Sequence, residues 1–136
     1  MLILKVISPH KVVLETKVRS VTLPTVEGEI TVLPRHAPIY TLIKGGEVIA
    51  RTEKGEEISM AVGSGFANIT ESGVTLLANF GVLSDEIDEN RAQEAKARAE
   101  ALLKDKKSMQ EMALASADLS RSLVELKLAS KRRGTR

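Results

Sequence analysis

The feature that most constrains this chain is an abrupt change of composition near residue 84. Residues 88–133 contain neither glycine nor proline, and alanine, glutamate, lysine, arginine and leucine dominate there. All four prolines and all three aromatic residues, by contrast, lie before residue 81. A long stretch without helix-breaking residues favours helix, whereas frequent glycine and proline mark closely spaced turns. We therefore expect two parts that pack by different rules, residues 1–84 and residues 85–136.

The first part has the pattern of a β domain. Short runs rich in β-branched residues, such as residues 3–7 and 58–62, are separated by turn residues, and apolar positions often alternate with polar ones. The run at residues 66–69, a turn at 71–73 and a run at 74–77 predict one hairpin. The spacing predicts about eight to ten short strands, which favours a sandwich or barrel over a parallel α/β sheet.

The second part predicts two helices. Asp88 is a suitable N-cap for a helix that runs to about Lys104. Ser108, with Glu111 three residues later, has the spacing of a capping box and starts a second helix that ends near Ser130. The expected inner faces are Ala92, Ala95, Ala99 and Leu102 on the first helix, and Met112, Ala115, Leu119, Leu123 and Leu126 on the second.

The short link between these helices predicts an antiparallel hairpin. The fold class is thus α+β in two parts, an N-terminal antiparallel β-sandwich followed by a C-terminal α-helical hairpin. Because an alanine seam buries little apolar area, at roughly 25 cal/mol per Å² the hairpin is expected to hold together only weakly.

Composition excludes several classes of function. The absence of cysteine removes disulfides, thiolate metal sites and a cysteine nucleophile, and a net charge of +2 gives no support for nucleic-acid binding. No window approaches the roughly 20 apolar residues of a membrane span, and Lys5 interrupts the first apolar run too early for a signal peptide. Any membrane association is expected to come through a partner.

Motifs for catalysis are also missing. The chain has no Gly-x-Ser-x-Gly elbow and no phosphate-binding loop, and the sole histidine besides His36 is His10. No metal-ligand spacing surrounds either histidine. We expect no catalytic or metal site, and an enzyme is the least favoured class.

Three segments carry a family resemblance. Residues 23–38 read LPTVEGEITVLPRHAP, residues 65–69 with 74–78 read GFANI and VTLLA, and residues 87–92 read IDENRA. Together they resemble the epsilon subunit of F-type ATP synthases, and the similarity runs from Leu2 to about Lys131. The motif in residues 23–38 is the specific part, because many alanine-rich hairpins look alike.

The resemblance implies a non-catalytic central-stalk (rotor) subunit of a proton-translocating ATP synthase. In that family the sandwich binds the gamma subunit along one face and the c-subunit ring at one end. The helices either stay folded or rise along gamma into the alpha/beta catalytic head, where they inhibit ATP hydrolysis. The implied location is peripheral, at the cytoplasmic face of the bacterial cell membrane, with no nucleic acid as partner.

The resemblance also suggests interface residues in the sandwich. Residues matching the c-ring and gamma interface are Glu27, Gly28, Glu29, Pro34, Arg35 and His36. The alternative is an ordinary β-turn, in which the glycine relaxes the backbone and the glutamates are merely solvated. For His36 a loop histidine that lies at an interface or is bonded to backbone is favoured over a catalytic base.

A regulatory nucleotide is a separate hypothesis. The residues that match the ATP-binding members of the family are Ile87, Asp88, Arg91, Ala92, Arg98 and Arg121. Guanidinium groups suit phosphate oxygens. Glu125, however, stands where those members have a further arginine, and its carboxylate would repel phosphate. Asp88 also has a structural role as an N-cap, and no cofactor is required for the implied function.

Basic residues gather toward the end of the chain. Those implied to contact an acidic segment of the beta subunit are Arg121, Lys127, Lys131, Arg132 and Arg133. A solvated, frayed terminus is the alternative. A nucleic-acid arm lacks an aromatic platform. The alternative for the whole chain is a stand-alone ATP-sensing or adaptor module that acts through its hairpin.

Overall fold

A computed structural model describes residues 1–105 and 108–134 of the chain, together with the side chains of residues 1–104 and 108–132. The chain divides into two compact units, Met1–Leu83 and Ser84–Arg136. Each unit has its own internal packing and is described separately.

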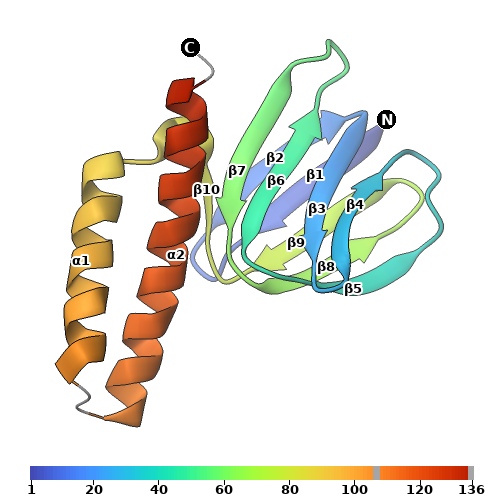
Figure 1. The fold of residues 1–136 in the computed structure, drawn as a ribbon. Helices are drawn as coiled ribbons and strands as arrows, with labels where there is room; N and C mark the ends of the chain where they lie inside the picture. Colours follow the sequence, from blue (N-terminus) through green and yellow to red (C-terminus); the bar gives the residue numbers. More distant parts are fainter. Residues whose placement is uncertain (106–107, 135–136) are drawn as a thin grey trace. The chain divides into compact units, whose positions relative to one another are not determined.

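The first unit is a β-sandwich. Its ten strands, all within the described residues 1–83, are drawn in blue to yellow in Figure 1. They are β1 (Leu2–Ile7), β2 (Val12–Val18), β3 (Ser20–Thr25), β4 (Gly28–Val32), β5 (Ile39–Ile43), β6 (Gly46–Arg51), β7 (Glu57–Val62), β8 (Gly65–Ile69), β9 (Gly73–Ala78) and β10 (Gly81–Leu83). The predicted hairpin around residues 71–73 is confirmed as the β8–β9 turn, and a second hairpin around Gly55 joins β6 to β7.

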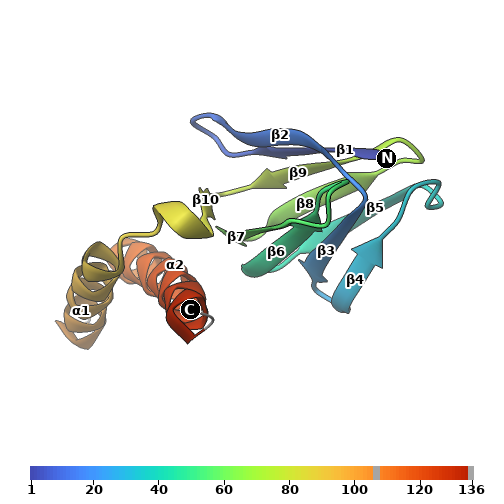
Figure 2. The ribbon, with the colours of Figure 1, turned by 90° about the horizontal axis from the view of Figure 1, so that it is seen from above.

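The strands form two layers, which Figure 2 shows nearly edge-on. One layer has the order β10-β7-β6-β3, with β4 also paired to β3, and the other has the order β5-β8-β9-β1-β2. A pairing between Thr25 of β3 and Ile43 of β5 joins them. Among the described strands β1 and β9 pair in parallel, whereas the other pairings are antiparallel. The sandwich is thus confirmed. The parallel strands β1 and β9 cannot be joined by a short hairpin turn, so their pairing does not follow from a local turn.

The core of this unit lies between the layers. Alternate residues of β1 are buried and more exposed in turn, because successive side chains of a strand point to opposite faces. The largest fully buried side chains are Leu2, Leu4, Leu23, Ile43, Met60, Ile69 and Leu76. Since all come from residues 1–83, the sandwich has a hydrophobic core of its own.

The second unit is the predicted helical hairpin. It consists of the short 3-10 helix η1 (Ser84–Glu86), α1 (Glu89–Asp105) and α2 (Met109–Gly134). Both predicted caps are confirmed. The backbone N–H of Arg91 donates to Asp88 Oδ1 at 3.2 Å, and that of Glu111 donates to Ser108 Oγ at 3.0 Å. α2 continues past the predicted end at Ser130, because no glycine or proline occurs before its last residue.

Most of the predicted inner faces are confirmed, since Ala92, Ala99 and Ala115 are buried and Ala95, Met112, Leu119 and Leu126 are half-buried, but two predicted positions are wrong. Leu102 and Leu123 are both 47% exposed. The buried positions that recur at seven-residue spacing are Ala92 and Ala99 in α1, and Ala115, Ser122 and Ala129 in α2. In a two-helix seam the contact positions alternate at spacings of three and four residues. Ser122, four residues before Leu126, therefore lies in the seam, whereas Leu123 points about 100° away from it around the helix axis.

Candidate partner-binding surfaces

An unbroken apolar row crosses the outer face of the β5-β8-β9-β1-β2 layer. Its members face one another in register across five neighbouring strands, and they are Leu42, Phe66, Leu77, Ile7 and Val12. Four of them, Leu42, Phe66, Leu77 and Val12, are between 42% and 51% exposed. Five strands at about 4.8 Å spacing give the row a length of about 19 Å. We name this set the apolar row.

An aromatic pair extends the apolar row at β5 and β8. The rings of Tyr40 and Phe66 have centroids 5.6 Å apart and an interplanar angle of 24°. Tyr40 is 66% exposed. Large exposed aromatic side chains are the residue type most enriched among the residues that dominate binding energy at protein interfaces.

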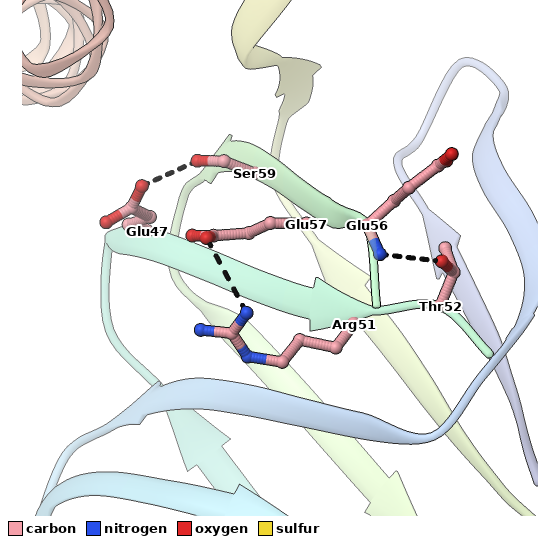
Figure 3. A network of polar contacts seen from close by, with 6 residues as sticks. All are labelled: Glu47, Arg51, Thr52, Glu56, Glu57 and Ser59. Atoms are coloured by element: carbon pink, nitrogen blue, oxygen red, sulfur yellow. Dashed lines mark hydrogen bonds and ion pairs between the residues drawn. The ribbon is translucent and has the colours of Figure 1, made fainter. Parts of the chain in front are cut away.

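The outer face of the other layer is mainly polar, although Ile49 and Ala61 also lie on it. The hydroxyl of Ser59 donates to Glu47 Oε2 at 2.5 Å, and Arg51 Nη1 lies 3.8 Å from Glu57 Oε2, as Figure 3 shows. The hydroxyls of Thr22 and Thr31 lie 3.0 Å apart on the same layer. The two outer faces of the sandwich therefore differ in character, and the apolar one is suited to protein contact.

The first group of expected interface residues forms the β3–β4 turn. Thr25 donates its hydroxyl to the carbonyl of Gly28, and the backbone N–H of Glu27 donates to Thr25 Oγ1 at 3.3 Å. Gly28 has a φ of 124°, a conformation that a side chain disfavours. Glu27 and Glu29 are both exposed, so the turn presents two carboxylates to solvent.

The second group lies in the loop after β4. Arg35 has a φ of 67°, uncommon for a residue other than glycine, and its backbone N–H donates to the carbonyl of Glu71 at 3.1 Å. The backbone N–H of His36 donates to the carbonyl of Leu33 at 3.2 Å and closes a turn. His36 Nδ1 lies 2.7 Å from the carbonyl oxygen of Ala37 and must donate to it, because a carbonyl only accepts.

The structure thus separates the expected interface residues into two groups. Glu27, Gly28 and Glu29 precede and begin β4, whereas Pro34, Arg35 and His36 follow its end. Gly28 and Val32 at the two ends of this strand are about 13 Å apart at 3.3 Å per residue. One group is acidic and the other basic, so they offer two different surfaces.

Four of the six expected nucleotide residues already have a structural role in the hairpin. Ile87 and Ala92 are buried, and the carboxylate of Asp88 caps α1. Arg121 Nε donates to Glu125 Oε1 at 2.8 Å, one helical turn further on. Arg91 and Arg98 are exposed on α1. The Arg121–Glu125 ion pair places the carboxylate directly against the arginine that was expected to hold phosphate.

The basic residues of α2 divide into two kinds. Arg121, Lys127 and Lys131 are exposed, as expected for contact with an acidic partner. Arg132 is instead half-buried, and its guanidinium donates to the backbone carbonyls of Ser84 and Ile87. The side chain of Arg133 lies outside the described part of the structure.

Sequence reasoning did not find the apolar row. Its signal is present in strands whose outward positions are also apolar, such as Tyr40 and Leu42 in β5. That signal is ambiguous, because a strand that is apolar on both faces could equally be buried on both. Among the described residues no group of three or more His, Cys, Asp or Glu side chains could hold a metal ion, and no helix is long and apolar enough to cross a membrane.

Comparison with known proteins matches both parts of the chain. Residues 1–83 match the family model of the ATP synthase delta/epsilon chain β-sandwich domain, and residues 85–130 match that of its long α-helix domain. The ATP synthase epsilon chain of Herpetosiphon aurantiacus is 36% identical over 96% of this chain and 95% of its own length. That of Dehalococcoides mccartyi is 39% identical over 96% and 93%. That of Rhizobium meliloti is 41% identical over 82% and 86%.

Solved structures agree on the fold. A chain of the Euglena gracilis mitochondrial ATP synthase, solved as an OSCP/F1/c-ring assembly, superimposes with a TM-score of 0.76 at 22% identity, covering 94% of this chain and 80% of that one. A chain of the Tetrahymena thermophila mitochondrial ATP synthase central stalk and c-ring gives 0.59 at 12% identity, covering 94% and 96%.

The β-sandwich joined to a helical hairpin therefore has the two-part architecture of a non-catalytic ATP synthase subunit. More narrowly, the chain belongs to the delta/epsilon chain family of ATP synthases, among relatives named epsilon chain.

Proposed function

We propose that this chain is a rotor subunit of a proton-translocating F-type ATP synthase, that it couples the gamma subunit to the c-ring, and that its helices inhibit ATP hydrolysis. The observation that carries the proposal is the apolar row, continued by the stacked Tyr40 and Phe66. Free in water, this row leaves apolar area exposed, and a partner that covers it gains roughly 25 cal/mol per Å².

The gamma subunit is proposed to cover the apolar row. A stable interface buries roughly 800 Å² on each partner, with an apolar centre and a polar rim. The apolar row supplies such a centre, and Lys5 and Glu15, which face each other across β1 and β2, supply part of a rim.

The two groups at the ends of β4 are proposed to contact different subunits, one of them the c-ring. Their opposite charges support this, since a surface that complements Glu27 and Glu29 repels Arg35. Contact with the ring would hold the chain peripherally at the cytoplasmic face of the bacterial membrane.

The helical hairpin is proposed to be the inhibitory element. Five of its buried positions carry alanine or serine, which limits the apolar area that holds it together, so a competing surface on the alpha/beta head could open it. The exposed cations Lys127 and Lys131 on α2 favour an acidic partner there. ATP binding by the hairpin stays a prediction. Two of the residues expected to bind ATP already have other partners, since Asp88 accepts from the backbone N–H of Arg91 and Arg121 donates to Glu125.

A matched pair of substitutions tests the gamma interface. Leu77→Glu places a charge in the middle of the apolar row, whereas Thr31→Glu places the same charge on the exposed outer face of the other layer. We expect the first to weaken gamma binding by about 30-fold or more and the second to leave it nearly unchanged. Equal effects of the two substitutions would refute the assigned face.

Removal of the helices tests the inhibitory role. A variant that ends at Asp85 keeps every core residue of the sandwich, so it should still bind gamma. We expect the catalytic head to hydrolyse ATP faster with this variant than with the whole chain. Unchanged hydrolysis, with gamma binding intact, would leave coupling as the function and remove inhibition.

A further inference from the structure

Arg132 lies near the end of α2 and contacts the segment that leads into α1. Its Nη1 donates to the carbonyl of Ser84, the first residue of the second unit, and its Nη2 donates to the carbonyl of Ile87 at 3.4 Å. Ile87 directly precedes Asp88, the cap of α1. A single guanidinium near the end of α2 thus holds the segment through which the chain enters the hairpin.

The helix lengths explain this position. α1 has 17 residues and α2 has 26, so at 1.5 Å per residue α2 is longer by about 13 Å. In the antiparallel hairpin the last turns of α2 therefore run past the start of α1 and pack beside η1. Arg132 closes the open end of the hairpin, which lies opposite the link between the helices.

The composition of the seam makes this contact important. Apart from the buried Leu128 and the half-buried Met112, Leu119 and Leu126 of α2, the buried positions of the two helices are Ala92, Ala99, Ala115, Ser122 and Ala129, which contribute methyl and hydroxymethyl groups only. Such side chains bury little area, and removing one of them changes stability little compared with a leucine. A charge-assisted hydrogen bond is worth more than a neutral one, so the Arg132 fork adds to the packing that holds the hairpin shut.

Arginine suits this role for two further reasons. Its planar group presents several N–H donors at once, so it can reach two carbonyls that a lysine ammonium would serve less well. Its charge also lies in the last turns of α2, where the helix dipole favours a cation.

We propose that Arg132 is a latch that keeps the hairpin folded, and that opening requires an acidic surface to replace the carbonyls of Ser84 and Ile87. This regulatory meaning rests on the proposed inhibitory role of the helices. In the folded hairpin the Arg132 guanidinium donates to two backbone carbonyls. An acidic partner that binds this guanidinium must replace these carbonyls as the acceptors, so binding of the partner opens the hairpin.

The latch can be measured in the whole chain without any partner. Because the chain has no cysteine, a spin-label pair can be attached at Glu94 on α1 and Ser120 on α2, both exposed. The separation of the labels then reports the fraction of open hairpin. Circular dichroism reports whether the helices themselves remain.

Three variants separate the latch from general charge. Arg132→Ala and Arg132→Lys both remove the fork, and both should raise the ratio of open to closed hairpin by about tenfold, the effect of losing a hydrogen bond to a charged group. Lys104→Ala removes an exposed charge from the other helix of the hairpin and should leave the ratio of open to closed hairpin unchanged.

Two results would overturn the proposal. One is an Arg132→Lys variant that stays as closed as the natural chain, and the other is a Lys104→Ala variant that opens as much as Arg132→Ala. If Arg132→Ala loses helix content, the lysine variant decides alone. Since no partner is present, a negative result removes the latch and leaves the hydrolysis test of the Asp85 truncation unaffected.

Discussion

Tyr40 and Phe66 stack on each other at 5.6 Å between ring centroids on a face of the sandwich where both side chains are substantially exposed. They come from neighbouring antiparallel strands, and Phe66 also belongs to the apolar row. Stacking holds each ring in place before any partner arrives. A preformed aromatic pair loses less conformational freedom on binding than two mobile rings do.

The aromatic pair should act as a coupled anchor for the gamma subunit. We expect Tyr40→Ala and Phe66→Ala each to cost about 2 kcal/mol of binding free energy. The double variant should cost less than the sum by about 1 kcal/mol, because each ring positions the other. Titration of gamma with the four proteins measures this coupling. Strict additivity would show that the stack does not contribute to binding.

Two adjacent leucines should separate stability from binding. Leu76 is fully buried, whereas Leu77 on the opposite face of β9 is 47% exposed. We expect Leu76→Ala to lower the free energy of unfolding by about 2–5 kcal/mol and Leu77→Ala by less than about 1 kcal/mol. Urea unfolding measures both. The order should reverse for gamma affinity, and two equal stability losses would contradict the assigned faces.

The strand pattern could be predicted from the sequence because alternation is a local property. The apolar row could not, because it depends on which strands become neighbours. Leu77 lies beside Ile7 because β1 pairs in parallel with β9, although the two strands are about 70 residues apart in the sequence. No turn motif connects them, so periodicity alone gives no register.

The helices show a similar limit. The caps at Asp88 and Ser108 follow from short-range chemistry and were predicted correctly. The seam depends on how one helix rotates against another, and Ser122 occupies the place expected for Leu123. The contact of Arg132 with Ser84 and Ile87 joins residues far apart in the sequence, so it could not be predicted from a basic residue near the end of a helix.

The two groups at the ends of β4 should capture different partners. A photo-crosslinking residue in place of Glu27 and one in place of Arg35 would each report its neighbour in the assembled complex. Both positions are exposed, so neither substitution should disturb the sandwich core. We expect crosslinks to two different subunits, with the c-ring as one of them. Capture of the same subunit from both positions would contradict the separation.

Glu125 should decide whether the hairpin binds ATP. Its carboxylate accepts from Arg121 Nε at 2.8 Å, so that arginine is engaged and a negative charge lies where phosphate would come. Glu125→Arg removes the repulsion, frees Arg121 and adds a cation that suits phosphate oxygens.

We expect this substitution to raise the affinity for ATP at least about tenfold, which corresponds to about 1.4 kcal/mol. The cost in helix stability should be about 0.5 kcal/mol, because an i,i+4 ion pair on a helix is worth little. Calorimetric titration of the natural chain, Glu125→Ala and Glu125→Arg measures the series, and Glu125→Ala should fall between the other two. The matching substitution Glu111→Arg, on an exposed residue in the first turn of α2, controls for added charge. If Glu125→Arg binds ATP no better than the natural chain, the expected residues do not form a nucleotide site in this hairpin.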